Sequence, residues 1–340
     1  MKKTLFRLRP TGVWIGIGIA VILFGAWLLT RTFVMAAYSV PTKAMEKTIR
    51  LGGKVLVNKL NYLPVSREDI LVFHFPEGDT VIDLPEYQSM RPYYEVIREM
   101  GHGNADAGRQ KLLADPDNFP LSIRPVSRRE TYLKRCIAIP GDTFEMRDEL
   151  VYIDGQLHAW PPEAETSFHV VIGGQFPDKA ELKAKYGLDI SNREEIRPLD
   201  SAGAYDMLLT WKAREKMLKD GFARLIVPDI DSSEYVFPYD TLHHWTRDNY
   251  GPLWIPKKGA SIQLTALNYP IYERIIRTYE GNKLEMQDGR IYVNGHEQNS
   301  YTFKMNYYWM IGDNLHGSQD SRYWGFVPED HLIGKASVTM

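Results

Sequence analysis

The sequence has very little cysteine, no excess of positive charge and no bias toward proline or glycine. Its single cysteine, Cys136, cannot form an intrachain disulfide, so a packed core must hold the fold together. The 41 Lys and Arg residues are balanced by 43 Asp and Glu residues, and this balance excludes general electrostatic attraction to nucleic acid. The 20 Pro and 26 Gly in 340 residues are too few for a disordered or collagen-like chain. The composition is therefore that of a folded protein.

Several enzyme classes also lack their sequence signatures here. There is no His-Glu-x-x-His zinc motif, and the adjacent His243 and His244 do not have the spacing of two ligands on a helix. A Walker loop, a Gly-x-Gly-x-x-Gly fingerprint and a Gly-x-Ser-x-Gly elbow are absent. Cys136 alternates with Lys134 and Ala138 along a predicted strand, where a small buried thiol is expected rather than a nucleophile. We therefore expect no metal or organic cofactor.

One long uncharged segment lies near the N-terminus. No charged residue occurs between Pro10 and Thr30, and large apolar side chains fill most of this stretch, which is long enough to cross a bilayer as a helix. The basic residues that flank it are Lys2, Lys3, Arg7 and Arg9 before it and Arg31 after it. Because basic residues gather on the cytoplasmic side of a membrane, we expect the N-terminus in the cytoplasm.

This asymmetry predicts the topology of the chain. We expect a cytoplasmic tail over residues 1–10, one membrane-spanning helix over 11–30, and every later residue on the outer side of the membrane. A cleaved secretory signal, with Val34, Met35 and Ala36 at the cleavage point, is the alternative. The apolar run is longer than the usual core of about 7–15 residues in such a signal, which favours a retained anchor.

The rest of the chain has mainly the pattern of short strands. The segments with this pattern are 54–58, 70–75, 132–155, 301–305 and 307–311. Helical patterns at 93–100 and 213–218 fall in two stretches of different composition. We predict a mainly β domain that carries two α+β insertions. The domain comprises residues 31–76, 131–156 and 263–340, and the insertions comprise 77–130 and 157–262.

A weak internal repeat relates residues 144–155 to residues 284–295. Both segments have the pattern of a hairpin followed by an Asp-Gly or Asn-Gly turn signal. The same offset places Lys134 opposite Arg274, and an arginine cannot be deprotonated in a protein. The second copy is then structural, and chance similarity of two hairpins explains the repeat equally well.

Three segments hold the residues that point to chemistry: Val40–Ile49, Tyr132–Asp142 and Gly312–Pro328. In this order, after an N-terminal apolar segment, they resemble type I signal peptidases. These are membrane-anchored serine endopeptidases that remove signal peptides from exported preproteins. The third segment is the most specific, with Gly-Asp-Asn followed by Ser-x-Asp-Ser-Arg-x-x-Gly. The resemblance covers about half of the chain and leaves both insertions without a match.

The resemblance implies a Ser-Lys dyad in which a serine attacks the peptide bond and a lysine acts as its general base. Lys134 matches the base, which requires a pKa lowered by an apolar setting. The nucleophile position, just before Met45, is occupied by Ala44. A methyl group cannot be acylated, so the chain as written is expected to be inactive.

Two explanations of Ala44 are open: a Ser→Ala change introduced to obtain an inactive protein, and a natural membrane-anchored pseudo-peptidase that binds exported chains without cutting them. We favour the first because the other positions of the site still match the family. A self-cleaving Ser-Lys regulator of the SOS-repressor type shares the dyad, but the long apolar segment and the lack of a helix-turn-helix region argue against it.

The resemblance also assigns supporting residues. Thr42 matches the position whose hydroxyl joins the backbone N–H of residue 44 in holding the oxyanion. Ser318 matches the residue that orients the lysine. Asp320 and Arg322 match a supporting ion pair, and Arg135 in the Lys-Arg run belongs with these supporting residues.

The implied partners are exported preproteins, bound through the end of the signal peptide and cut after small residues (Ala-x-Ala), together with membrane lipid; no nucleic acid is expected. The implied location is the bacterial cytoplasmic (inner) membrane, with a single pass and the catalytic domain on the outer, periplasmic side.

Overall fold

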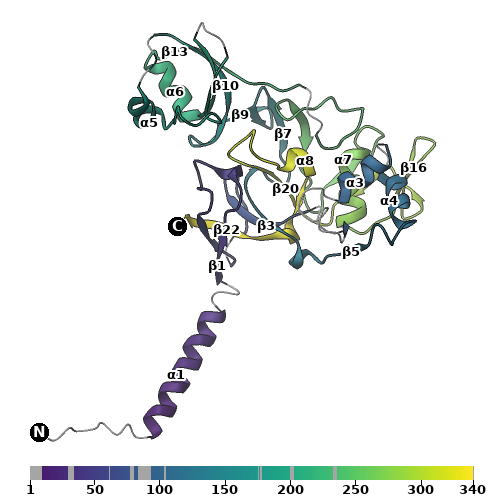
Figure 1. The fold of residues 1–340 in the computed structure, drawn as a ribbon. Helices are drawn as coiled ribbons and strands as arrows, with labels where there is room; N and C mark the ends of the chain where they lie inside the picture. The colour runs from purple at the N-terminus through teal and green to yellow at the C-terminus, as the bar shows by residue number, and fades with distance from the viewer. Residues whose placement is uncertain are drawn as a thin grey trace, which may run out of the picture.

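A curled seven-stranded antiparallel sheet forms the centre of the molecule (Figure 1). The computed structural model describes residues 10–29, 34–60, 62–76, 80–82, 93–102, 105–174, 176, 178–199, 203–232 and 236–339. In spatial order the strands are β1 (Met35–Ser39), β2 (Lys54–Asn58), β22 (Leu332–Thr339), β3 (Ile70–His74), β6 (Thr131–Ala138), β20 (Tyr307–Ile311) and β21 (Val327–Pro328). The prediction of a mainly β domain is confirmed.

Strand β20 shows why this sheet lies at the centre of the core. All five of its residues are buried, and they alternate between two hydrophobic clusters. Tyr307, Trp309 and Ile311 belong to the largest cluster, while Tyr308 and Met310 belong to a second cluster on the other side. Because successive side chains of a strand point to opposite faces, a strand that is apolar at every position is covered on both faces.

The predicted strand at 301–305 is wrong in its extent. Strand β19 (Ser300–Thr302) ends at Thr302, where its pairing with β15 (Ser261–Gln263) ends. The next residue, Phe303, instead exchanges backbone hydrogen bonds with Gly259 and Ala260 in the turn before β15. The predicted strands at 54–58 and 307–311 match β2 and β20.

The two similar segments do fold as hairpins. The first contains β7 (Thr143–Arg147), β8 (Leu150–Ile153) and β9 (Gln156–His158), and the second β16 (Leu284–Gln287), β17 (Arg290–Val293) and β18 (His296–Glu297). Both Asp154-Gly155 and Asn294-Gly295 have positive φ angles, as a type I′ turn requires. Upstream the likeness ends, because Arg274 lies on the helix α7 (Tyr269–Arg274) and Lys134 on a strand.

The first predicted insertion contains two short helices over a small core of its own. Its elements are β4 (Thr80–Ile82), α3 (Tyr93–Met100), α4 (Ala105–Leu113), β5 (Leu121–Ile123) and the 3-10 turn η3 (Val126–Arg128). Helix α3 has the predicted bounds. Val96 and Ile97 of α3 and Leu112 of α4 pack with Ile82 of β4.

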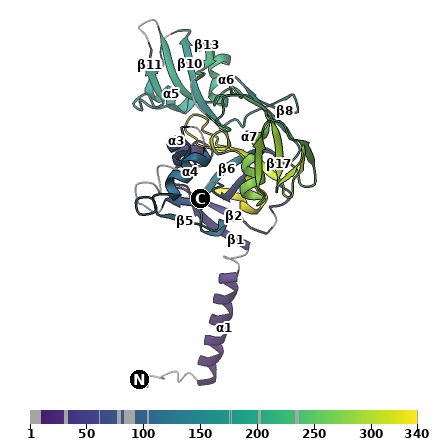
Figure 2. The same cartoon turned by 90° about the vertical axis from the view of Figure 1, so that its right-hand side faces the viewer.

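The second predicted insertion contains a four-stranded antiparallel sheet with its own hydrophobic cluster. The strands, in spatial order, are β11 (Ile196–Pro198), β12 (Ala204–Thr210), β10 (Glu165–Ile172) and β13 (Ala223–Pro228). Helices α5 (Lys179–Tyr186) and α6 (Trp211–Lys219) pack with this sheet, and Phe168 and Met217 are fully buried among them. Figure 2 shows this module lying to one side of the central sheet.

The chain then returns to the central part of the molecule. Strand β14 (Tyr250–Trp254) pairs with β7, and Tyr250 packs against Phe144 and Trp309 in the largest cluster. The remaining elements are η2 (Lys43–Met45), the π-helical turn η4 (Ile275–Tyr279), α8 (Ser321–Trp324) and η5 (Glu329–His331).

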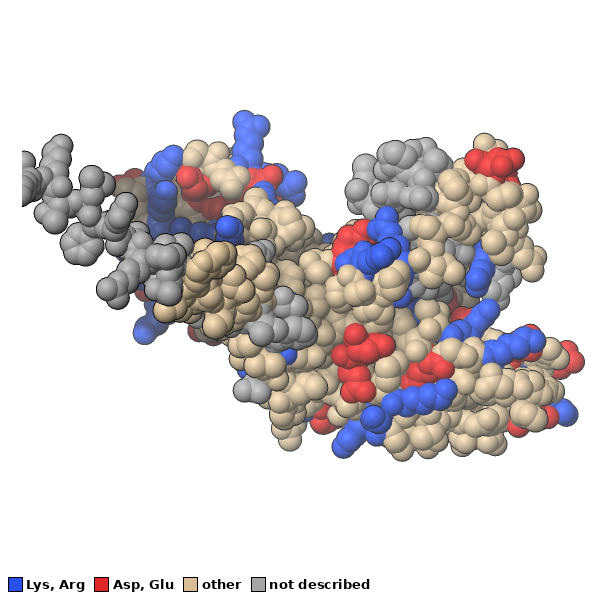
Figure 3. Space-filling model, turned by 90° about the horizontal axis from the view of Figure 1, so that it is seen from below, with Lys and Arg blue, Asp and Glu red and all other residues tan. Residues whose placement is uncertain are grey.

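The N-terminal helix α1 (Pro10–Leu29) projects away from the rest of the molecule (Figure 1). Its large apolar side chains from Trp14 to Leu28 are exposed. Figure 3 shows the helix without charged side chains, whereas the body beside it carries groups of both signs. Among the residues that the structure describes, no helix combines the length and the apolar character needed to span a membrane. Residues 1–9 and 30–33, including most of the expected tail, lie outside the described residues.

We predict that the module β10–β13 unfolds independently of the central sheet. Phe168→Ala removes a fully buried ring from its cluster and should cost about 3–5 kcal/mol there. Hydrogen exchange should then show lost protection in β10, β12 and β13 and unchanged protection in β3, β6 and β20. Phe144→Ala is the matched control, since it removes an equally buried ring from the main cluster. Equal loss across both sheets in either variant would contradict separate cores.

Candidate active site

The first and third predicted segments contact each other directly. The turn η2 lies beside β6, and within it Ala44 and Met45 are buried. The backbone N–H of Asn314 donates to the carbonyl of Ala44 at 3.0 Å, and the N–H of Asp313 donates to Sδ of Met45 at 3.4 Å. The segment that contains Ala44 is therefore held by the loop that follows β20.

Lys134 is buried at the middle of β6, with 3% of its surface exposed. Its Nζ donates a hydrogen bond to Oγ of Ser318 at 2.8 Å and lies 5.9 Å from the centre of the Trp324 ring. Burial lowers the pKa of Lys134 to about 8, because the charged form loses its hydration. Asp320 opposes this shift and Arg322 adds to it. An amine with this pKa is partly deprotonated near neutral pH, as a general base requires.

Gly312 brings Ala44 and Ser318 together. A Cβ atom at residue 312 would lie 2.3 Å from Oγ of Ser318 and 2.6 Å from the carbonyl oxygen of Ala44. Gly312 therefore lies between the Ser318 hydroxyl, which contacts Lys134, and the backbone of Ala44. No side chain fits at this position. The sequence contains Gly312 in the matched motif, but its role is visible only in the packed loop.

The loop Gly312–Arg322 is braced by a fully buried ion pair. Arg322 donates from Nε and from Nη2 to the two carboxylate oxygens of Asp320, each at 2.8 Å. The same carboxylate accepts from the N–H of Gly312, and Arg322 also donates to the carbonyl of Leu315 at 2.6 Å. Burial alone would raise the pKa of Asp320, but the positive charge and hydrogen bonds of Arg322 have the larger effect, so the pKa is lower than usual. These bonds fix both ends of the loop that carries Ser318.

Arg135 is brought to the same loop from the other side. Its guanidinium donates to both carboxylate oxygens of Asp313, at 2.7 and 2.5 Å, and the Thr48 hydroxyl donates to the same group at 2.5 Å. Asp313 thus connects β6, the loop and the segment after η2. No sequence pattern indicated a role for Thr48, and Asp313 stood out only as part of the specific Gly-Asp-Asn run.

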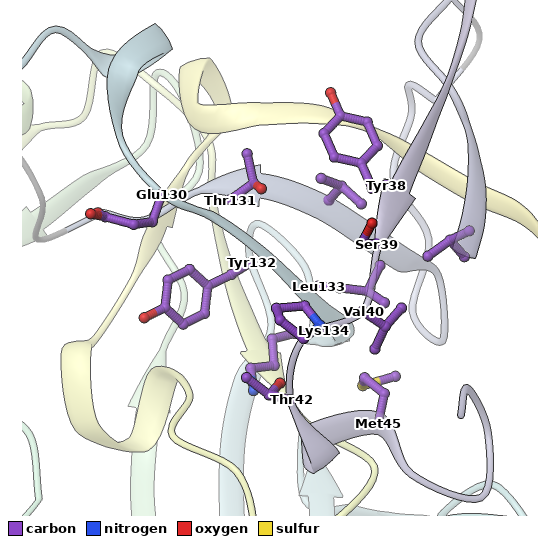
Figure 4. A pocket seen from close by; sticks show the side chains of 13 residues that line it. Tyr38, Ser39, Val40, Thr42, Met45, Glu130, Thr131, Tyr132, Leu133 and Lys134 are labelled. Atoms are coloured by element: carbon purple, nitrogen blue, oxygen red, sulfur yellow. The ribbon is translucent and has the colours of Figure 1, made fainter. Parts of the chain in front are cut away.

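A cavity of about 380 Å³ opens beside Lys134 (Figure 4). Two stretches of chain supply most of its lining, residues 38–42 and 130–134. Thr42 lies in this wall, and its side chain makes no capping bond to η2. Strand β1 is at the edge of the central sheet, and β20 pairs with β6 only from Arg135 onward. The cavity therefore lies between the end of the edge strand β1 and the part of β6 that does not pair with β20.

The structure thus brings six of the seven predicted site residues into one connected set. Ala44, Lys134, Ser318, Asp320, Arg322 and Arg135 are joined through direct contacts or through the loop Gly312–Arg322. Thr42 joins them as part of the cavity wall that Lys134 also lines.

The sequence of this chain is similar to sequences of known proteins. The sequence matches the family described as "Signal peptidase, peptidase S26" over residues 13–185 and 298–340. It is similar to a protein named "Signal peptidase I" from Leptolyngbya laminosa, with 25% identity over 33% of this chain and 63% of the relative. A "Signal peptidase I" from Haemophilus influenzae is 22% identical over 91% of this chain and 64% of the relative.

A third relative shares a short and much more similar stretch. The "Signal peptidase I" of Buchnera aphidicola subsp. Schizaphis graminum is 66% identical over 32 residues, 9% of this chain and 10% of the relative. The chain therefore spans less than two thirds of the length of each of these three relatives.

We predict that Gly312→Ala separates Ser318 from the Ala44 segment. The new methyl group would meet atoms on both sides at less than 3 Å, so the loop must shift, at a cost of about 1–3 kcal/mol. The free energy of unfolding in urea measures this cost. Gly174→Ala is the control, because open space surrounds that position. A loss no larger than that of Gly174→Ala would show that the loop does not need the close approach.

Proposed function

Since this chain belongs to the signal peptidase family, peptidase S26, we propose that it has the site of a serine endopeptidase that removes N-terminal signal peptides from exported preproteins. The observation that carries the proposal is the buried Lys134, with its lowered pKa and its bond to Ser318, beside the segment that contains Ala44. In this proposal Lys134 is the general base and residue 44 is the nucleophile position.

With a serine at residue 44, the proposed reaction follows from these positions. Neutral Lys134 takes the hydroxyl proton while the oxygen attacks the scissile carbonyl. The Thr42 hydroxyl and the N–H of residue 44 donate to the oxyanion. The lysine then gives the proton to the leaving amine, which breaks the peptide bond. Water, deprotonated by the same lysine, hydrolyses the acyl-enzyme and restores the hydroxyl.

Ser318 is proposed to orient the lysine rather than to attack. Its Oγ accepts the hydrogen bond from Nζ of Lys134 at 2.8 Å, so this hydroxyl can fix the position of the amine. Asp320, Arg322 and Arg135 are proposed to support the loop through the ion pairs described above.

The chain as written carries Ala44, which has no hydroxyl, so we propose that it binds substrates without cutting them. We favour an introduced Ser→Ala change as the origin of Ala44. The hydrogen bond between residue 44 and Asn314 uses the backbone carbonyl of residue 44, so it does not depend on the side chain. The second candidate function, favoured by Ala44 itself, is a natural pseudo-peptidase that binds exported chains. Restoring the serine separates the two.

We propose that the substrate binds in extended form along the cavity. The edge position of β1 and the limited pairing of β6 with β20 favour added strand pairing there. Tyr38, Tyr132 and Met45 are among the residues that line the cavity, and we propose that these large side chains restrict it to small residues at the cleavage point. This agrees with cleavage after Ala-x-Ala.

We also propose that the uncharged segment over residues 11–30 is a single-pass anchor in the bacterial cytoplasmic membrane, with the N-terminus inside and the β domain on the periplasmic side. The absence of charge from Pro10 to Thr30, the exposed apolar side chains of α1 and the basic residues before it support this. Ala44 follows Thr30 closely, so even an extended tether keeps the site within roughly 50 Å of the membrane.

We predict that Ala44→Ser makes the chain cut a labelled preprotein after Ala-x-Ala, with a rate that rises with pH through about 8 as Lys134 loses its proton. Ala44→Ser combined with Lys134→Ala should be slower by about 10²–10⁴-fold. Gel analysis of the cleaved product in detergent measures both.

The matched control is Ala44→Ser with Lys54→Ala, which removes an exposed strand lysine and should leave the rate unchanged. A folded Ala44→Ser protein that cuts nothing would favour the pseudo-peptidase. Equal cutting of a preprotein with phenylalanine at the last signal position would contradict the proposed small-residue cavity.

We predict that Thr42→Val, in the Ala44→Ser background, lowers kcat by about 10²–10³-fold and changes KM little, since it removes one oxyanion donor. Thr42→Ser keeps the hydroxyl and should keep most of the activity. Steady-state kinetics with a fluorogenic signal peptide measures the two constants. Equal activity of Thr42→Val and Thr42→Ser would remove Thr42 from the oxyanion hole.

A further inference from the structure

His316 lies two residues before Ser318 and contacts a cluster of acidic groups outside the site described above. Its Nε2 is 2.6 Å from Oε1 of Glu149 and 3.6 Å from Oδ1 of Asp248. Both carboxylates are fully buried. Glu149 lies in the turn between β7 and β8, and Asp248 just before β14.

The backbone and side chains around the two acids are tightly connected. The N–H of Glu149 donates to the carbonyl of Asp248, and the Thr166 hydroxyl donates to Oε1 of Glu149 at 2.7 Å. Asp248 accepts from Nε of Arg247 at 3.1 Å and from the N–H of Asp231 at 2.9 Å. The second oxygen of Glu149, Oε2, is buried and has no hydrogen-bond partner among the described residues.

A count of charges indicates what His316 does there. The carboxylate forms of Glu149 and Asp248 carry two negative charges, and the one positive charge of Arg247 is shared between Asp248 and Asp231. A buried carboxylate without a counter-charge is costly, so the remaining negative charge requires a second cation. Within the described residues, the side chain placed to supply it is a protonated His316. No bound metal ion is needed to balance the cluster.

The second predicted insertion contacts the loop that carries Ser318 at several points. On one side of the loop, His316 meets Asp248. On the other side, the backbone carbonyl of Glu165 in β10 accepts from the N–H of Leu315, and the N–H of Glu165 donates to the carbonyl of Asp313. The carbonyl of Arg247 also accepts from Arg322 at 3.4 Å. The loop is thus held between the central sheet and residues 165–248.

We propose that positively charged His316, held between Glu149 and Asp248, is a positioning residue that keeps Ser318 on Lys134, and that residues 165–248 thereby form part of the frame of the active site. The consequence for catalysis rests on the proposed function, but the effect on Lys134 does not. The charged groups that act on His316 are Glu149, Asp248 and Arg247, all from other elements.

The cluster has a defined dependence on pH. Burial lowers the pKa of His316, but Asp248 and Glu149 outweigh it and raise the pKa to about 8. Because this value is above that of the unfolded chain, about 6.5, the stabilisation is complete below pH 6.5 and is lost as pH rises through 8. The thermal midpoint of the chain should therefore fall above pH 7, and His316→Gln should remove this part of the fall.

The test uses the full chain in detergent, with Ala44 as given. Carbon-13 NMR of ε-labelled lysine, assigned with Lys134→Met, measures the pKa of Lys134. We expect about 8 in the unchanged chain and a rise of at least about one unit in His316→Gln, because the loosened loop would admit water to Lys134. His243→Gln is the matched control, since His243 is similarly buried and pairs with Asp240. An unchanged pKa of Lys134 in folded His316→Gln would overturn the proposal.

Two further measurements keep the result clear. Glu149→Gln combined with His316→Gln removes both charges of the closest pair, so the double variant should be no less stable than either single variant. The double variant also provides the test if His316→Gln alone does not fold. If its loss of stability equals the sum of the losses of the two single variants, the proposed ion cluster is overturned. The second measurement is the thermal midpoint with zinc chloride. If zinc raises the midpoint, EDTA reverses the rise and His316→Gln abolishes it, the ion cluster is overturned in favour of a metal site.

Activity then separates this inference from the proposed function. In the Ala44→Ser background, His316→Gln should lower kcat about 10- to 100-fold. If Ala44→Ser is inactive but the pKa of Lys134 depends on His316, the positioning role stands without the peptidase. If Ala44→Ser cuts equally well with and without His316, the peptidase stands and the positioning role falls.

Discussion

The burial of Lys134 is the constraint on which the site depends. A charged lysine in an apolar setting loses its hydration, and this lowers its pKa. Among the described residues, Lys134 donates to the Ser318 hydroxyl and has no ion pair with a carboxylate. That single hydroxyl must stay in place, and the buried pair of Asp320 and Arg322 holds the loop that carries it. A weaker loop would admit water, restore the usual pKa and leave the lysine protonated near neutral pH.

The same loop organises the rest of the site through its backbone. Its N–H groups hold the carbonyl of Ala44 and the sulfur of Met45, while the Asp313 carboxylate receives Arg135 and Thr48. None of these bonds uses the side chain of residue 44. A serine and an alanine at this position therefore fit the same frame, and the proposed loss of chemistry requires no loss of structure.

Local patterns predicted much of the fold because they are set by nearest neighbours. The strands at 54–58 and 307–311 and the helix at 93–100 follow from apolar spacing, and the turn signals at Asp154 and Asn294 follow from their tolerance of positive φ. The order of three short motifs predicted the family and named the site residues. The extent of the strand at 301–305 was wrong, since strand pairing and not residue type ended it.

The sequence alone determined which residue types occur, where strands and turns form, and that residue 44 has no hydroxyl. Which of these residues contact one another depends on how distant parts of the chain pack together. Lys134 and Ser318 are separated by 184 residues, and Arg135 and Asp313 by 178. No local periodicity encodes such pairs, and neither the role of Gly312 nor the contact of His316 with Glu149 and Asp248 could be read from spacing. Burial, which sets the pKa of a lysine, is a property of everything packed around it.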